Sequence, residues 1–413
     1  MTAPTGSHLL PASGLTMRRG SGARRAAGCE MHTPTVFDSF FMAGFECSTH
    51  RRRDGRRLDL IAGTRHDRWA ANDYRAVAAH GLRTVRDGLR WHLIEQRPGH
   101  YDWSSFLPML HAAQATGTQV IWDLCHYGWP DDVDIWRPQF VERFARFSAA
   151  VAQCVKNETD AVPVYAPLNE ISYWAWAGGD QGRMHPLARG RGFELKHQLV
   201  RASIAAIEAV RSVEPRARFV QVDPAIHVAA SNDRPGPRRE AERLRQAQFE
   251  AWDMLCGTQW PGLGGAPQYL DMIGVNYYSN NQWYLGGATI AADSPDYRPF
   301  SEMLGEIWQR YQRPIVVAET GAEGDHRARW LDHVGGEVAL ALQRGVAMEG
   351  LCLYPVLDYP GWENNRHCPT GLLGYADAAG EREVHAELAA QLRHEQVRFG
   401  FSAPQFALDD IAT

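Results

Sequence analysis

Long apolar runs are missing from this sequence, and so is an excess of either charge. No stretch of about 18 apolar residues is present, so the sequence predicts no membrane span. Its start also lacks the apolar segment of a signal peptide. The 43 Lys and Arg nearly balance the 48 Asp and Glu, for a formal net charge of −5, without a basic stripe or an acidic tail. We therefore expect neither a nucleic-acid partner nor a membrane surface.

Cysteine is sparse and shows no pairing pattern. The seven cysteines are scattered, odd in number and without the spacing of a metal site, and several lie in apolar runs such as "VIWDLCHY" and "EGLCLYP". We therefore predict reduced cysteines in the core of a cytoplasmic protein, with no disulfide framework and no metal site.

The first 35 residues have no helical or strand period and are rich in Gly, Ser, Pro and Arg. Such a composition predicts a disordered extension, or a start site assigned upstream of Met31, in preference to a transit peptide. One domain is predicted over residues 36–405, followed by a short tail over 406–413.

From Phe37 onward, short apolar runs alternate with longer amphipathic segments. Eight runs predict strands: 40–46, 83–89, 119–125, 162–169, 218–224, 271–278, 314–320 and 349–356. Six segments have helical spacing: 68–80, 140–155, 195–213, 238–256, 327–343 and 384–398. Apolar strands that alternate with helices indicate parallel β structure buried on both faces. The pattern predicts a single-domain (β/α)8 TIM barrel. The alternative, a doubly wound open sheet, lacks the glycine-rich turn after its first strand that a dinucleotide site needs.

Polar and aromatic residues stand at the ends of the predicted strands, where a TIM barrel places its active site. They are Arg86, Asp87, His126, Tyr127, Trp129, Asn169, Glu170, Asn276, Tyr277, Tyr278, Glu319, Tyr354 and Asp358. Glu170 and Glu319 end the fourth and seventh strands, which face each other across the barrel mouth. Paired carboxylates suit glycoside hydrolysis, in which one is the acid and the other the nucleophile. The charge of Glu319 should raise the pKa of Glu170, and Arg86 should keep Glu319 ionised. The alternative is two solvated strand-end carboxylates.

Five motifs resemble those of one enzyme family, and they occur in the order of that family. "GLRTVRDGLRW" resembles G-x-x-x-x-R-F-S-I-S-W, "LCHYGWP" resembles L-x-H-W-D-x-P, and "PLNEIS" resembles x-x-N-E-P. "IGVNYYS", which contains Asn276, resembles I-G-x-N-Y-Y, and "VVAETG" resembles x-x-T-E-N-G. The chain thus resembles a divergent member of glycoside hydrolase family 1, the β-glucosidase-like retaining enzymes of clan A, from about Phe40 to Gly374.

The resemblance implies roles for individual residues and no cofactor or metal. Glu170 would be the acid/base, Glu319 the nucleophile, and Asn169 the group that binds the sugar 2-hydroxyl. Tyr278 and Arg86 would donate hydrogen bonds to the nucleophile, and His126 would bind a hydroxyl in the same subsite. Four tryptophans are candidate platforms for sugar stacking: Trp129, Trp174, Trp176 and Trp362.

The sugar-recognition residues depart from the family pattern. Where the family has a Gln after the first strand, "GFECSTHRR" offers Glu46, His50 or Arg51. In "YPVLDYPGWE", Tyr354 stands for the platform Trp and Gly361 for the gripping Glu, while Trp362 is kept and Glu363 comes two positions late. We therefore expect simple β-glucosides to be poor substrates, with the preference set by Arg51, Trp362 or Glu363.

Other functions use the same residues differently. A transglycosidase would pass the same intermediate to an alcohol or sugar, and a catalytically inactive barrel would only bind saccharides. A metal-dependent barrel hydrolase is a further alternative. The predicted partner is in every case a carbohydrate or glycoside, and segments 176–194, 225–240 and 279–300 should wall the cleft. The oligomeric state stays open.

Overall fold

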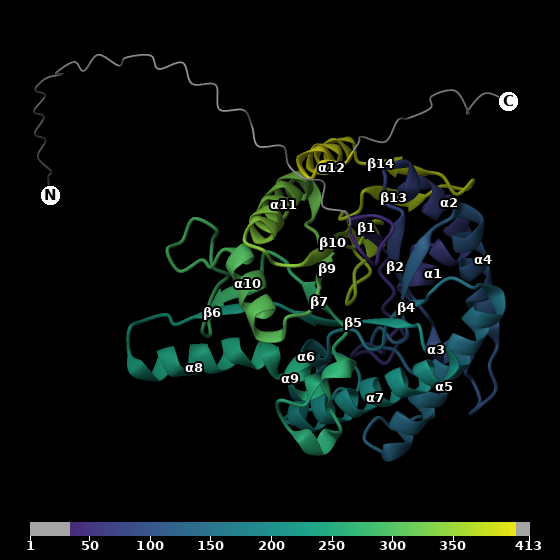
Figure 1. Ribbon diagram of the computed structural model, residues 1–413, viewed down its shortest axis with the longest axis horizontal. Helices are drawn as coiled ribbons and strands as arrows, with labels where there is room; N and C mark the ends of the chain where they lie inside the picture. The colour runs from purple at the N-terminus through teal and green to yellow at the C-terminus, as the bar shows by residue number, and fades with distance from the viewer. Residues whose placement is uncertain (1–33, 402–413) are drawn as a thin grey trace, which may run out of the picture.

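The computed structural model describes residues 34–401, so most of the predicted N-terminal extension and all of the C-terminal tail lie outside the described residues. Eight parallel strands form a closed barrel in the order β1-β10-β9-β7-β5-β4-β3-β2 (Figure 1). Their bounds are β1 Phe41–Gly44, β2 Thr84–Gly88, β3 Gln119–Asp123, β4 Val164–Ala166, β5 Arg218–Pro224, β7 Met272–Asn276, β9 Ile315–Thr320 and β10 Met348–Leu353. Each lies within or one residue beyond a predicted strand, so the predicted TIM barrel is confirmed.

Helices surround the barrel. They are α1 Leu60–Gly63, α2 His66–Ala79, α3 Trp91–Ile94, α4 Leu107–Thr116, α5 Pro138–Glu158, α6 Ile171–Trp174, α7 Gly192–Val213, α8 Pro235–Gln246, α9 Glu250–Cys256, α10 Phe300–Tyr311, α11 Arg327–Gln343 and α12 Ala386–Arg398. The predicted helix 238–256 is interrupted by a 3-10 turn at Ala247–Phe249, which separates α8 from α9. Five of the helices listed here were not predicted: the one-turn helices α1, α3 and α6 and the longer helices α4 and α10. The apolar residues of α4 do not form a clear stripe, whereas α10 buries Phe300, Met303 and Ile307 at helical spacing.

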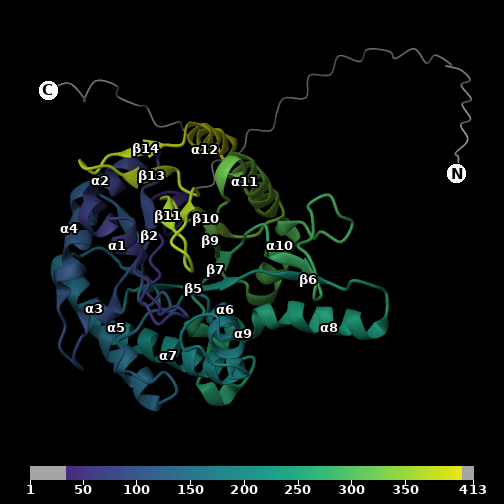
Figure 2. The same cartoon turned by 180° about the vertical axis from the view of Figure 1, so that it is seen from behind.

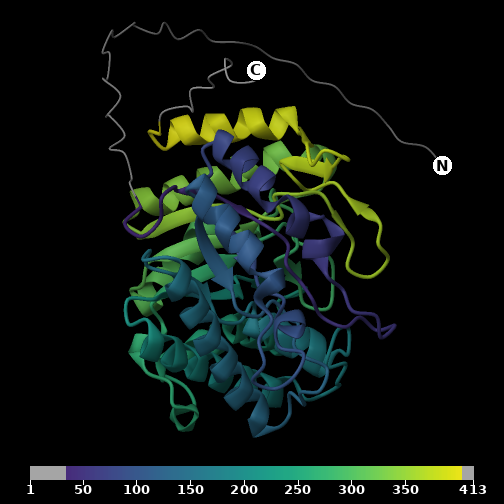
Figure 3. The ribbon, with the colours of Figure 1, turned by 90° about the vertical axis from the view of Figure 1, so that its right-hand side faces the viewer.

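The ring of helices closes between the last helix and the first long one. In Figure 3, α12 is the yellow helix along the top of the molecule. It packs against α11 on one side. On the other side, Gln396 Nε2 donates to the carbonyl of His80, directly after α2, at 2.8 Å. Phe399 stacks near Phe40, just before β1, with ring centroids 5.0 Å apart. These contacts join the two ends of the domain.

Two apolar cores follow from the alternation of side chains along the strands. The larger core lies between strands and helices, and it buries Phe140, Phe144 and Phe147 on the predicted face of α5. The smaller core fills the barrel with alternate strand residues, which include Met42, Ile121, Val164, Val220, Met272, Val316 and Cys352. Gly44 is required beside it, because a Cβ at this position would lie 2.1 Å from the Tyr354 ring.

The additional strands form three two-stranded sheets outside the barrel: β6 His227–Ala229 with β8 Gln282–Tyr284, β11 Tyr359–Pro360 with β12 His367–Cys368, and β13 Leu373–Ala376 with β14 Arg382–Val384. Figure 1 shows β6 and α8 extended away from the barrel. Figure 2 shows β11, in yellow, next to β10. The six cysteines that the structure describes are free, and five of them are buried. Within residues 34–401, no helix is long and apolar enough to cross a membrane.

Candidate active site

A cavity of about 1700 Å³ opens at the carboxyl ends of the barrel strands. Glu170 and Glu319 both line it, as do His126, Tyr278 and Tyr354. Residues of all three long segments that were predicted to wall the cleft also line it, among them Trp176, Phe193, Ile226, Asn280 and Trp283. The TIM barrel thus brings the two glutamates into one space.

Glu319 ends its strand as a buried carboxylate that faces a cation. It lies in β9 and is 5% exposed. Arg86 Nη1 donates to its Oε1 at 2.7 Å, and the Tyr278 hydroxyl donates to its Oε2 at 3.0 Å. These are the two contacts that the sequence predicted for this carboxylate.

Glu170 is held by neutral donors instead. It follows β4 and precedes α6 with left-handed backbone angles, φ 46° and ψ 63°, which are uncommon for a residue with a side chain. The Tyr127 hydroxyl donates to its Oε2 at 2.5 Å. Asn276, which neighbours Glu319 across β7 and β9, donates to its Oε1 at 2.9 Å. Each glutamate is therefore fixed by two donors, but Arg86 contacts only Glu319.

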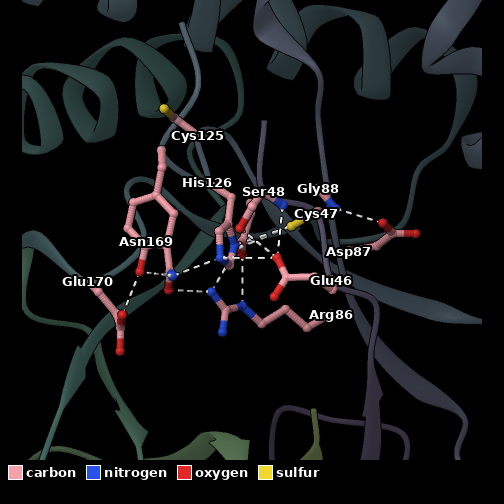
Figure 4. Close-up of polar contacts among 12 residues, drawn as sticks. Glu46, Cys47, Ser48, Arg86, Asp87, Gly88, Cys125, His126, Asn169 and Glu170 are labelled. Carbon is pink, nitrogen blue, oxygen red and sulfur yellow. Dashed lines mark hydrogen bonds and ion pairs between the residues drawn. The ribbon is translucent and has the colours of Figure 1, made fainter. Parts of the chain in front are cut away.

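Arg86 joins the two halves of the site (Figure 4). It is a fully buried guanidinium that pairs with both oxygens of Asp123, at 2.9 and 2.6 Å. Its Nη2 also donates to Asn169 Oδ1 at 2.7 Å. The Asn169 amide donates in turn to His126 Nε2 at 2.9 Å and to the Tyr127 hydroxyl at 3.0 Å. A continuous chain of hydrogen bonds therefore runs from Glu319 to Glu170.

Burial raises the pKa of both glutamates, and different neighbouring groups then act on the pKa of each one. For Glu170, the hydrogen bonds from Tyr127 and Asn276 lower the pKa and the buried Asp223 raises it. For Glu319, burial raises the pKa to about 7 against the charge of Arg86, with Glu170 adding to the rise. A guanidinium at 2.7 Å stabilises a carboxylate more than neutral donors do, so Arg86 favours the ionised form of Glu319 over that of Glu170. The expected direction for Glu170 is found, but burial, rather than the charge of Glu319, is its main cause.

His126 packs in the same network. Its Nδ1 contacts Asp123 Oδ2 at 2.8 Å, and its ring stacks on Tyr354 at 6.1 Å between centroids. Cys47 Sγ lies 3.2 Å from Nδ1, so Cys47, Asp123 and His126 form a group with metal-ligand atoms. The sequence spacing did not indicate this group. Because Arg86 already occupies both oxygens of Asp123, a cation placed there would face a buried guanidinium.

The remaining predicted residues divide into two groups. Trp362 and Glu363 line the cavity, and Tyr354 lies beside Arg86 at 5.4 Å. Arg51 is not brought to the cavity, because its guanidinium pairs with Asp131 at 2.7 and 2.5 Å and also donates to the Gly55 carbonyl.

Among the predicted tryptophan platforms, Trp176 and Trp362 line the cavity. Trp129 and Trp174 are wrong as platforms. They are at most 1% exposed and donate to the carbonyls of Val133 and His185, so they serve as packing.

Two site residues were given no role from the sequence, although Tyr127 was among the strand-end residues. Asp123 aligns both Arg86 and His126, and its signal is an acidic residue inside the apolar run "VIWDLC". Tyr127 bonds to Glu170 from the position directly after His126, in "LCHYGWP". Its backbone is also left-handed, with φ 67°.

Comparison with solved structures shows which known fold this is. A β-glucosidase from Thermotoga maritima in complex with glucoimidazole has a TM-score of 0.73 and 16% identity, over 89% of this chain and 99% of that one. A family 1 β-glucosidase from Thermotoga maritima has a TM-score of 0.72 and 16% identity, over 90% and 99%. The chain has the fold of the family 1 β-glucosidases. The sequence matches no protein-family model and no curated protein sequence.

The sequence offered three residues after β1 for contact with the sugar, Glu46, His50 and Arg51, and the structure separates them. Glu46 lines the cavity, whereas His50 and Arg51 do not belong to its lining. His50 is 3% exposed and packs its ring edge-on against Trp362 at 4.9 Å. Of the three residues that the segment offers, Glu46 is the one that can touch a ligand.

Proposed function

We propose that this protein is a retaining β-glycosidase that hydrolyses O-glycosidic bonds by double displacement. The observation that carries the proposal is the asymmetry between two carboxylates in one cavity. Glu319 contacts a buried guanidinium, and Glu170 contacts only neutral donors. That is the arrangement needed for an ionised nucleophile beside a protonated acid.

In the first step, a Glu319 oxygen forms a bond to the anomeric carbon while the glycosidic C–O bond breaks. Glu170 gives its proton to the leaving oxygen. In the second step, water attacks the anomeric carbon, Glu170 takes a proton from that water, and Glu319 leaves as a carboxylate. Arg86 and Tyr278 hold the nucleophile. Asn169 and His126, one hydrogen bond apart, are proposed to bind neighbouring sugar hydroxyls.

Azide rescue of two variants tests this assignment. In Glu319→Gly, azide replaces the nucleophile and attacks in one displacement, so the product should be the glycosyl azide of inverted configuration. In Glu170→Gly, Glu319 still forms the covalent intermediate, so azide should give the product of retained configuration. Identical configurations from the two variants, or an unchanged rate in Glu319→Gly, would contradict the assignment.

A trapping experiment complements the rescue. An aryl 2-deoxy-2-fluoro-glycoside slows both steps and should leave its sugar on the wild-type chain, within the peptide that contains Glu319. Transfer of the sugar from a normal substrate to an added alcohol would indicate transglycosylation by the same intermediate.

A further inference from the structure

Glu46 is a third carboxylate in the cavity, and the proposed reaction does not use it. It follows β1 by two residues, is 7% exposed and lines the cavity together with Tyr354 and Trp362. Figure 4 shows its side chain beside Arg86 and His126. A carboxylate at this depth needs partners for both of its oxygens.

Only one of those oxygens is satisfied. Glu46 Oε1 accepts from the Ser48 backbone N–H at 3.0 Å and from the Ser48 hydroxyl at 2.6 Å. Among residues 34–401, no hydrogen-bond partner is found for Oε2. Both contacts fall on Oε1, so Oε2 is the oxygen that is left for a ligand in the cavity.

Within residues 34–401, no cationic side chain donates a hydrogen bond to this carboxylate. Arg86 donates its N–H groups to other acceptors, which are Asp123, Glu319, Asn169 and the Ala318 carbonyl. His126 Nε2 lies 3.9 Å from Glu46 Oε1, which is too far for a hydrogen bond, and contacts the Asn169 amide at 2.9 Å instead.

The deep end of the cavity thus has more buried carboxylates than cations. Glu46, Glu319 and Asp123 share this region with the guanidinium of Arg86 and the imidazole of His126, whose pKa is raised, against the effect of burial, by Asp123 and Glu46. A buried carboxylate without a counter-charge is costly, and a cation brought by the ligand would remove that cost.

The surroundings of Glu46 also suit a cation. The Tyr354 hydroxyl is buried and has no hydrogen-bond partner among the residues that the structure describes, and the side chain lines the cavity. Tyr359 and Trp362 line the same end. A carboxylate among aromatic rings is the usual environment for an ammonium group, because the ring faces attract positive charge.

We propose that Glu46 binds the ammonium group of an amino sugar, so that the glycone of the substrate is cationic. This proposal rests on the proposed glycosidase function. The order of contacts along the site indicates which carbon of the sugar ring carries the amine. Contacts of 2.5, 3.0, 2.9 and 3.9 Å run from Glu170 through Tyr127, Asn169 and His126 to Glu46. If Asn169 binds the 2-hydroxyl, Glu46 reaches position 3 or 4.

Matched substrates test the charge directly. A nitrophenyl β-glucoside would be compared with its 3-amino-3-deoxy and 4-amino-4-deoxy counterparts, which carry the same leaving group. At neutral pH, kcat/KM for one amino sugar should exceed that of the glucoside by about 10- to 100-fold, the range expected for a charge-assisted contact. Glu46→Gln keeps the shape and should remove this preference, because kcat/KM should fall much further for the amino sugar than for the glucoside. Glu302→Gln, which removes an exposed charge on α10, should change neither value.

The outcomes separate the two proposals. If the glucoside is used as well as both amino sugars, or if Glu46→Gln lowers all three values equally, Glu46 accepts a neutral hydroxyl and the amino-sugar proposal fails. Chemical unfolding of Glu46→Gln should match the wild type, and a large loss of stability would assign Glu46 a structural role instead. Failure of azide rescue and of Glu319 trapping with all three sugars would overturn the glycosidase function itself.

Discussion

Tyr127 offers a sharp test of how the acid/base carboxylate is tuned. Its hydroxyl donates to Glu170 at 2.5 Å and accepts the Asn169 amide at 3.0 Å, while its ring is 1% exposed. Tyr127→Phe keeps the ring in its packing and removes only these two hydrogen bonds. Because the ring stays, the substitution isolates the effect of one donor on one carboxyl group.

The direction and size of the effect follow from that hydrogen bond. It stabilises the ionised form of Glu170, so its loss should raise the pKa of this group further. A hydrogen bond to a charged group contributes about 1.5–3 kcal/mol, which corresponds to about one to two pKa units. Asn276 still donates to the other oxygen, so we expect the lower end, about one unit. Glu170 would then stay protonated to higher pH.

The assay is the pH dependence of kcat/KM with a poorly activated leaving group such as unsubstituted phenol, because only such a substrate needs the acid. The basic limb should move about one unit to higher pH in Tyr127→Phe. Tyr165→Phe is the control and should leave the profile unchanged, because the hydroxyl of this buried tyrosine has no hydrogen-bond partner within residues 34–401. A basic limb that stays in place or moves to lower pH would refute the reasoning.

Three further predictions concern neighbouring charges. Glu170→Ala should slow substrates with poor leaving groups by at least about 100-fold and activated aryl glycosides far less, and equal losses would argue against the acid role. Arg86→Lys cannot replace the paired contacts with Asp123, so kcat should fall about 100-fold and unfolding free energy by about 3 kcal/mol, measured by steady-state kinetics and denaturant titration. Burial opposes the charge of His66, but Asp87 and Asp73 raise its pKa from 6.5 to about 9. Its stabilisation is therefore complete below pH 6.5 and is lost as pH rises through 9, so His66→Gln should flatten the stability profile in that window, by about 3 kcal/mol in total.

The barrel and the two glutamates could be predicted from the sequence, because both depend on the local pattern of apolar and polar residues. Strands buried on both faces read as apolar runs, and the residue after each run lies at the same end of the barrel whatever the loops do. Glu170, Glu319, Arg86 and Tyr278 were therefore placed correctly in one site. Helix α10 was missed although its apolar residues have helical spacing, so it could have been predicted. The apolar residues of α4 form no clear stripe, so their pattern did not indicate a helix.

The recognition residues depended on the tertiary structure. Glu46, His50 and Arg51 are near neighbours in sequence, but only Glu46 lines the cavity, because Asp131 binds Arg51 and Trp362 packs over His50. Likewise, Trp174 and Trp176 are two residues apart, yet one is in the core and the other lines the cavity. Loop direction is decided by long-range contacts with partners that local sequence does not reveal.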